Sequence, residues 1–372
     1  MLNLLFATRF LINKWAFPVF NQIWSVGFFL SFLILLMRRQ LRVNAKILLL
    51  FSLTSLYLLF SLSFSPSRII FWRQYYIFVF GFLSFIIGRS LDSQKIMRAL
   101  VFSSFLVSLV SFYAFFIGKG HILFYLRESN INNPFAEYFL RQNRAFFPFL
   151  LPNTLGSFMS LAFILNLGVS YEEREKVWQV ILGVVFMSLV ILSRSLGALF
   201  CLSVVLSVYL LLTKRKAKVQ FVFFLLAAFL VIFFIFILRQ NSVVIATPSF
   251  SFWQRLHFWQ RAFLLIARHP LAGCGAGGYY LYTGIMYCHN VFLQMWLDYG
   301  ILGFAAFAAT TAYLLRSSQR LILSKPHKQF FLSLFLANLF FLLHNLIDID
   351  FYIFQLSFVW FVIAGIIGKE DS

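Results

Sequence analysis

Charged residues are scarce in this 372-residue sequence, and acidic residues are the scarcest. Asp and Glu number 11 against 31 Lys and Arg, and charged residues together make up only 11%. A soluble domain carries about a quarter charged residues. Hydrophobic residues reach 62% and the mean hydropathy is +0.88. The composition excludes an ordinary soluble protein and predicts an all-α polytopic membrane protein.

Other absences exclude further classes of protein. The sequence has no acidic tail, low-complexity tract or repeat of 20–50 residues. Its net charge of +20 is spread over short loops between apolar runs rather than gathered on one face, so we exclude nucleic acid as a partner. Arg9 and Lys14 interrupt the first apolar run and no small-residue cleavage site follows, so we expect no cleaved signal peptide.

Apolar runs long enough to cross a bilayer fill most of the chain, and we predict one transmembrane domain over residues 1–372 with eleven or twelve helices. Residues 1–17 form either the twelfth span or an interfacial helix. The eleven other predicted spans lie near residues 19–37, 47–64, 69–87, 98–118, 149–169, 177–192, 196–212, 219–238, 291–315, 330–345 and 351–367.

The basic residues predict the orientation of these spans. About 18 of the 31 Lys and Arg residues fall in one set of short loops, which the positive-inside rule makes cytoplasmic, together with the C-terminus. Two long loops on the opposite face, 119–148 and 239–290, nevertheless keep arginines, and the second contains no acidic residue. Arginines held where topology disfavours them indicate an anionic ligand. The alternative is that they extend to lipid phosphates at the interface.

One stretch, residues 253–303, concentrates polar side chains in this apolar chain, and we predict that it carries the active site. An amphipathic run with Arg255 and Arg261 is followed by His269 and Pro270. Five glycines come next, between positions 273 and 284, and His289 then stands before a long apolar segment.

The order and spacing of these residues resemble the O-antigen ligase and polymerase family. Arg194 in SRS, and Asn153 with Gly156 in PNTLG, resemble two further patches of that family. The main pattern consists of Arg255, Trp259, Ala262, Ile266, Pro270, Leu271, Gly273, Gly275, Gly277, His289, Asn290, Leu293, Gln294, Gly300 and Gly303.

The resemblance implies a GT-C-like glycosyltransferase of lipopolysaccharide biosynthesis in the bacterial inner membrane, multi-pass, with its active site on the periplasmic side. Such an enzyme moves a glycan from undecaprenyl diphosphate to a hydroxyl of lipid A-core or another glycan acceptor, among membrane lipids and without a cofactor or metal. The family's functional arginines match Arg194 and Arg255, and its functional histidine matches His289.

These residue types suit that chemistry. Guanidinium groups bind diphosphate oxygens and stabilise the charge that develops on the leaving group. A neutral imidazole can act as general base toward the acceptor hydroxyl, and direct displacement inverts the anomeric configuration. We assign Arg194 and Arg255 to the diphosphate and His289 to the base. The candidates for substrate binding are Arg144, Arg261, Asn153, Asn290 and Asp298.

Structural alternatives stand beside these roles. His289 and Asn290 can simply cap a helix, and Asp298 can be the structural partner of an arginine. The glycine segment is either flexible backbone beside a bulky sugar or an ordinary turn.

Two further pairs of residues carry weaker signals. Asp348 and Asp350 form a DxD pair, but no nucleotide sugar is expected there and we predict no metal site. Cys274 and Cys288 share the outer loop, which leaves a disulfide open.

Two alternative functions remain. An O-antigen polymerase uses the same donor, and sequence motifs separate it poorly from a ligase. A transporter or flippase for an anionic lipid-linked substrate belongs to another class, but it would place charges and Gly or Pro breaks inside its spans. Here nearly all charges lie in loops or at span ends, and Arg73 is the nearest exception.

Overall fold

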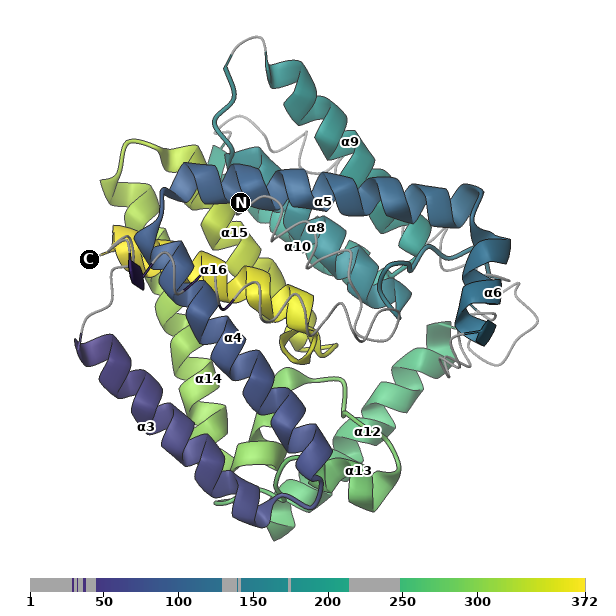
Figure 1. Ribbon diagram of the computed structural model, residues 1–372, viewed down its shortest axis with the longest axis vertical. Helices are drawn as coiled ribbons and strands as arrows, with labels where there is room; N and C mark the ends of the chain where they lie inside the picture. The colour runs from purple at the N-terminus through teal and green to yellow at the C-terminus, as the bar shows by residue number, and fades with distance from the viewer. Residues whose placement is uncertain are drawn as a thin grey trace. The chain divides into compact units, whose positions relative to one another are not determined.

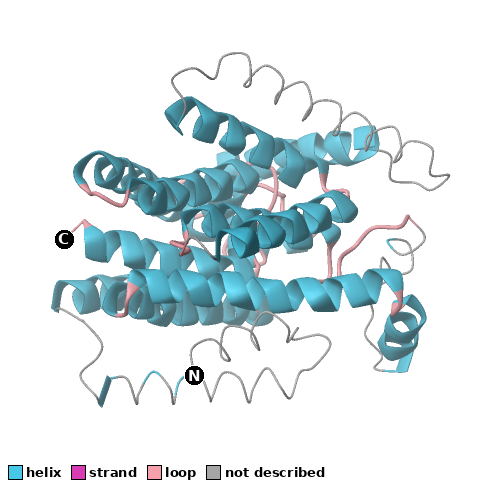
Figure 2. Cartoon of the chain, turned by 90° about the horizontal axis from the view of Figure 1, so that it is seen from above, coloured by secondary structure: helices cyan, strands magenta, loops and turns pink. Residues whose placement is uncertain are grey.

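The computed structural model describes residues 45–128, 142–172, 175–213 and 248–371, together with residues 29, 32, 36, 37 and 139. The described residues form helices joined by loops and contain no strand (Figures 1 and 2). Five of these helices are long and apolar enough to cross a membrane, namely α4, α5, α9, α10 and α14. The prediction of an all-α polytopic membrane protein is therefore confirmed.

Nine of the predicted apolar runs coincide with helices, because apolar residues in lipid satisfy their backbone groups only in closed hydrogen-bonded structures. The predicted spans at 19–37 and 219–238 and the segment 1–17 lie outside the described ranges, apart from four residues of the first. The nine helices are α3 (Ala45–Ser61), α4 (Arg68–Ser90), α5 (Ser93–Phe116), α8 (Pro152–Gly168), α9 (Lys176–Ser193), α10 (Leu196–Thr213), α14 (Val291–Ser324), α15 (Lys328–Asn345) and α16 (Phe354–Glu370).

The two predicted outer loops also contain helices. The loop at 119–148 includes α6 (Lys119–Glu128), and the loop at 239–290 includes α12 (Pro248–Arg268) and the short α13 (Gly278–Thr283). Two 3-10 turns complete the described elements, η1 (Leu62–Phe64) and η3 (Asp350–Tyr352).

The chain divides into two compact units. Unit 1 comprises residues 1–38, 91–243 and 322–340. Within it α8 packs against α5, α9 and α10. Local signals set the helix starts: the Asp92 side chain accepts a hydrogen bond from the Lys95 N–H at 2.8 Å, and Pro152 occupies the first turn of α8, where its missing N–H has no cost.

Unit 2 comprises residues 39–90, 244–321 and 341–372, and α4 and α16 pack along each other within it. Glycines permit this approach. A Cβ at Gly88 would lie 2.3 Å from the Val362 carbonyl oxygen, and one at Gly365 would lie 2.1 Å from the Phe85 carbonyl oxygen. Small residues at helix interfaces are the usual means of close packing in membranes.

Helix α14 is longer than the predicted span at 291–315, and it is broken at Gly300, where φ is 65° and ψ is −167°. In an uninterrupted helix the Ile301 N–H would bond the Leu297 carbonyl. Here the Ile301 N–H donates to the Leu271 carbonyl at 3.2 Å, and the Leu297 carbonyl accepts from the Cys274 N–H at 2.7 Å. The loop that follows α12 therefore docks its backbone into the break.

This docking accounts for part of the glycine run. A Cβ at Gly300 would lie 1.9 Å from the Leu271 carbonyl oxygen, and one at Gly273 would lie 2.5 Å from the Leu297 carbonyl oxygen. Both glycines have positive φ, which other residues rarely adopt. Of the two readings that the sequence left open, the structure favours a closely packed turn.

Candidate active site

Arg255 and His289 converge on the carboxylate of Asp348 within unit 2. The Arg255 Nη2 atom lies 3.2 Å from Asp348 Oδ2, and the His289 Nδ1 atom lies 3.2 Å from Asp348 Oδ1. The Asp348 side chain is only 7% exposed, whereas Arg255 and His289 retain 20% and 29% exposure. A buried carboxylate thus joins two partly accessible groups.

The amphipathic helix α12 directs Arg255 inward. At 100° per residue, Arg255 shares a face with Ala262 and Ile266, both of which are buried. Arg261 and Arg268 lie on the opposite, exposed face of the helix. The sequence grouped Arg255 with Arg261, but the structure separates them: only Arg255 reaches Asp348.

His289 has a left-handed backbone conformation, with φ at 56°. Such a conformation costs a non-glycine residue about 1–3 kcal/mol and persists only where the surroundings hold it. Asn290 supplies part of that hold, since its Oδ1 atom accepts from the Leu293 N–H at 3.1 Å at the start of α14. Its Nδ2 atom donates to the Leu346 carbonyl at 2.9 Å, which ties His289 to the turn that carries Asp348. Asn290 is therefore both a helix cap and a bridge.

The turn between α15 and α16 presents Asp348. Its backbone N–H donates to the His344 carbonyl at 2.8 Å, and the His344 Nδ1 atom lies 2.8 Å from Asp350 Oδ2. The side chains of His344 and Asp350 are almost fully buried, at 1% and 3% exposure. The two carboxylates of the DxD pair thus bond different partners. Among the described residues, no group of three His, Cys, Asp or Glu side chains is arranged to hold a metal ion.

Neighbouring groups determine the charge of Asp348. Burial would raise the pKa of this carboxyl group, but the hydrogen bond to His289 and the electrostatic effect of the nearby His289, Arg255 and His344 side chains outweigh burial. The pKa of Asp348 is held well below its ordinary value. The group is therefore a carboxylate at neutral pH.

Asp298 lies in a different environment, at 1% exposure inside unit 2. Its oxygens accept hydrogen bonds from Gln294 Nε2 at 2.9 Å, Gln74 Nε2 at 2.8 Å and the Tyr352 hydroxyl at 3.0 Å. Gln294 also accepts from the Cys288 N–H at 2.9 Å. The network thus links α4, α14 and η3 to the residue that precedes His289.

Three other predicted residues come together in unit 1. Arg144 is 5% exposed, and it donates through Nε to the Ser193 carbonyl at 3.0 Å and through Nη2 to Asn153 Oδ1 at 3.2 Å. Arg194 donates through Nη1 to the Gln142 carbonyl at 2.9 Å. Arg194 ends α9 in a left-handed conformation, with φ at 49°. Among the described residues, only three residues other than glycine have positive φ, and Arg194 and His289 are two of them.

Cys274 and Cys288, in the predicted outer loop, are free thiols, so the disulfide that the sequence left open is not formed. Cys274 donates to the Leu297 carbonyl at 3.4 Å and Cys288 to the Asn290 carbonyl at 3.3 Å. Burial raises the pKa of each thiol to about 12. Both groups are therefore protonated at neutral pH.

The role of Asp348 is the feature that the sequence did not predict. The sequence singled out Asp348 only as part of a DxD pair with no expected metal, and it placed Asp298 rather than Asp348 among the candidates for substrate binding. The available signal was the position of Asp348 in a short turn on the same predicted face as His289.

Fold and site together define a polytopic helical membrane protein in which a histidine and an arginine meet one buried carboxylate. A family model described as O-antigen ligase matches residues 180–308, a segment that contains Arg194, Arg255 and His289. Over this segment the chain matches the O-antigen ligase family, which confirms the resemblance found in the sequence. No curated protein matches the chain. This match indicates a membrane enzyme of the glycosyltransferase kind that acts on lipid-linked glycans.

Proposed function

We propose that the protein is an O-antigen ligase that transfers a glycan from undecaprenyl diphosphate to a hydroxyl of lipid A-core. The reaction takes place on the periplasmic face of the inner membrane, inverts the anomeric configuration and uses neither metal nor cofactor. The observation that carries the proposal is the Asp348 carboxylate joining Arg255 to His289, in a chain of the O-antigen ligase family.

His289 is the general base. With Asp348 bound at Nδ1, the imidazole keeps its proton on that nitrogen and directs Nε2 toward the acceptor hydroxyl. The hydroxyl proton passes to Nε2 as the acceptor oxygen forms its bond to the anomeric carbon. Asp348 remains ionised, because its pKa is low, and stabilises the resulting imidazolium.

Arg255 stabilises the leaving group. The bond from the anomeric carbon to the diphosphate oxygen breaks, and undecaprenyl diphosphate departs with the electron pair. One Nη atom of Arg255 bonds Asp348, which leaves other N–H groups of the guanidinium for diphosphate oxygens. Before the reaction Arg255 and Asp348 balance each other's charge. Proton uptake by His289 then adds a positive charge as negative charge develops on the leaving group.

Residues of unit 1 have a supporting role in this proposal. Arg194 keeps the role that the family resemblance implies for it, as a second guanidinium for the donor diphosphate. Arg144 and Asn153 fix the backbone around that arginine through the Ser193 carbonyl and their mutual hydrogen bond.

Acceptor transfer by the purified protein in liposomes, with lipid-linked glycan and lipid A-core, tests this assignment. We expect His289→Ala, Arg255→Ala and Asp348→Asn each to lower the rate at least a hundredfold, the usual contribution of a general base or an oxyanion donor. His257→Ala and Arg268→Ala are matched controls that remove exposed side chains of the same types from the outer face of α12. They should transfer at the wild-type rate, and a chelator should have no effect.

Three outcomes would overturn the proposal. Full activity of a folded His289→Ala protein would remove the base, and equal losses in the control variants would show that any change to α12 disables the protein. Longer lipid-linked chains in place of glycosylated lipid A-core would identify a polymerase instead.

A further inference from the structure

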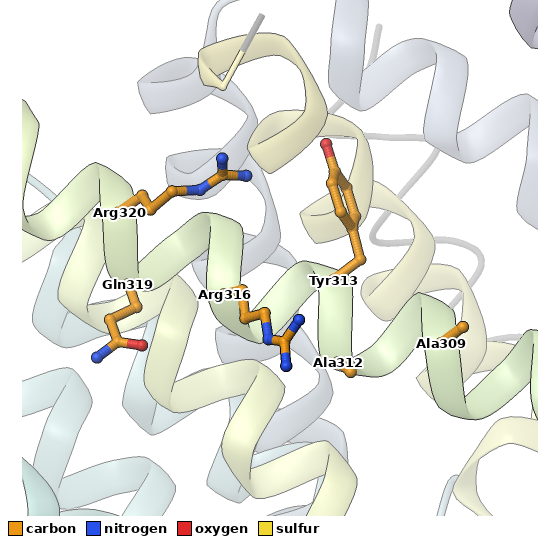
Figure 3. A pocket seen from close by; sticks show the side chains of 6 residues that line it. All are labelled: Ala309, Ala312, Tyr313, Arg316, Gln319 and Arg320. Atoms are coloured by element: carbon orange, nitrogen blue, oxygen red, sulfur yellow. The ribbon is translucent and has the colours of Figure 1, made fainter.

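A cavity of about 610 Å³ lies along α14, near the end of the helix that is farther from His289 (Figure 3). This volume falls in the usual range for small-molecule sites. The cavity belongs to unit 2, and its lining residues are Ala309, Ala312, Tyr313, Arg316, Gln319 and Arg320.

The length of α14 sets the depth of this cavity in a bilayer. Beyond the break at Gly300 the helix rises about 1.5 Å per residue, so Arg316 lies about 22 Å and Arg320 about 28 Å along it from Ile301. The hydrocarbon core is about 30 Å thick, and about 40–45 Å with the headgroup regions. Both guanidinium groups therefore lie well over half of the core thickness beyond the break, toward the leaflet that the sequence predicts to be cytoplasmic.

The lining is apolar toward the membrane interior and basic at the other end. Ala309 and Ala312 stand one turn apart and have short side chains, so they leave a groove along the helix, which the ring of Tyr313 borders. Arg316 and Arg320 form the rim. An apolar groove that ends in guanidinium groups matches the acyl chains and the phosphate of a phospholipid.

The charges at the rim are not equivalent. Arg320 Nη2 lies 2.9 Å from Asp371 Oδ2, and the Tyr313 hydroxyl donates to the same oxygen at 3.3 Å. Figure 3 shows the Tyr313 and Arg320 side chains extending toward the same side of α14. Arg316 is exposed and has no hydrogen bond or ion pair with another described residue. Its charge is therefore available to an anion.

We propose that this cavity binds an anionic phospholipid of the phosphatidylglycerol type. Arg316 and Gln319, whose side chains extend toward the same side of α14 (Figure 3), hold the phosphate, and the acyl chains follow the groove at Ala309 and Ala312. A soluble phosphate would use only the rim, and the groove would then have no occupant. This site is independent of glycan transfer.

Native mass spectrometry of the purified protein in detergent tests the proposal, with phosphatidylglycerol titrated against phosphatidylcholine of the same acyl chains. Wild type should prefer phosphatidylglycerol. Arg316→Gln should weaken binding of phosphatidylglycerol about fivefold, the effect of one basic residue at a lipid surface, and leave phosphatidylcholine unchanged. Ala312→Phe should weaken binding of both lipids, because the ring fills the groove.

Matched variants control for charge and bulk. Lys325→Gln removes a positive charge just beyond the end of α14, and Ala306→Phe adds the same ring to an exposed position of the helix outside the cavity. Both should bind like wild type, and thermal unfolding checks that every variant is folded. Equal binding of the two lipids by wild type, or unchanged binding by Arg316→Gln and Ala312→Phe, would overturn the proposal. Displacement of the lipid by soluble glycerol phosphate would assign the rim to free phosphate instead.

Discussion

Replacing Gly300 with alanine tests whether the break in α14 is a fixed structural element. The glycine is buried, with φ at 65° and ψ at −167°, a combination that is almost confined to glycine. The alanine Cβ would stand 1.9 Å from the Leu271 carbonyl oxygen, which belongs to backbone and cannot rotate away. Either the loop must leave the break or the helix must change its path.

The size of the effect follows from these contacts. The backbone conformation costs about 1–3 kcal/mol for a residue with a Cβ. Displacing the loop loses the bonds from Ile301 N–H to Leu271 and from Cys274 N–H to Leu297, each worth about 0.5–1.5 kcal/mol. We expect Gly300→Ala to lower the free energy of unfolding by about 2–6 kcal/mol.

Unfolding of the protein in mixed micelles titrated with SDS measures this difference, and two other glycines separate its causes. Gly284 has φ at 71° but open space around its Cβ position, so Gly284→Ala should show only the conformational cost of about 1–2 kcal/mol. At Gly183, inside α9, the nearest atom is 3.6 Å away and φ is ordinary, so Gly183→Ala should be neutral or slightly stabilising. If Gly300→Ala is as stable as Gly183→Ala, the docking of the loop into α14 is wrong.

Three further predictions follow from the polar groups of unit 2. The pKa of Asp348 is lowered, so the stability contributed by its charge is present at neutral pH and is lost as the pH falls below about 4. The Tm of Asp348→Asn should therefore lie below that of wild type at neutral pH, and the difference should shrink at acidic pH. A difference in Tm that does not change with pH would contradict this. Asp298→Leu leaves three buried donors unsatisfied and should cost more than about 3 kcal/mol in the SDS titration, whereas a loss below about 1 kcal/mol would mean that the network is dispensable. Because the pKa of Cys274 and Cys288 is about 12, their thiolate fraction at pH 8 is about a thousandfold below that of an ordinary thiol. Iodoacetamide should therefore label both cysteines far more slowly in the native protein than after denaturation. Mass spectrometry follows the labelling.

The helical class and most helix positions were predictable from the sequence, because membrane spans are set by length and hydropathy alone. The predicted run at 177–192, for example, became α9 over Lys176–Ser193. The end of α14 was predicted at residue 315, but the helix continues to Ser324, since Arg316 and Arg320 end the apolar run without ending the helix. The break at Gly300 was not predicted, because it depends on contacts with a loop nearly thirty residues earlier in the chain.

The site was predictable in its residue types and less so in its pairings. Arg255 and His289 were both selected from the sequence, and the helical period alone separates Arg255 from Arg261, which lies six residues later and on a different face of α12. The left-handed conformation of His289 and the double role of Asn290 required the structure. The sequence had indicated the helix-capping half of that role, but nothing local in it marks the bond from Asn290 to Leu346 or the conformation of His289.

The choice of carboxylate shows where chain topology would have improved the prediction. Asp298 is the aspartate nearest to His289 in sequence, but it lies about 10 Å along α14 from Val291 and bonds Gln74, Gln294 and Tyr352 instead. Asp348 is 59 positions beyond His289. Two predicted spans, 291–315 and 330–345, nevertheless separate the two residues, so the predicted topology returns the turn that carries Asp348 to the face on which His289 lies. For a loop residue at one end of a span, polar partners are therefore better sought in turns two spans away than along the helix that follows it.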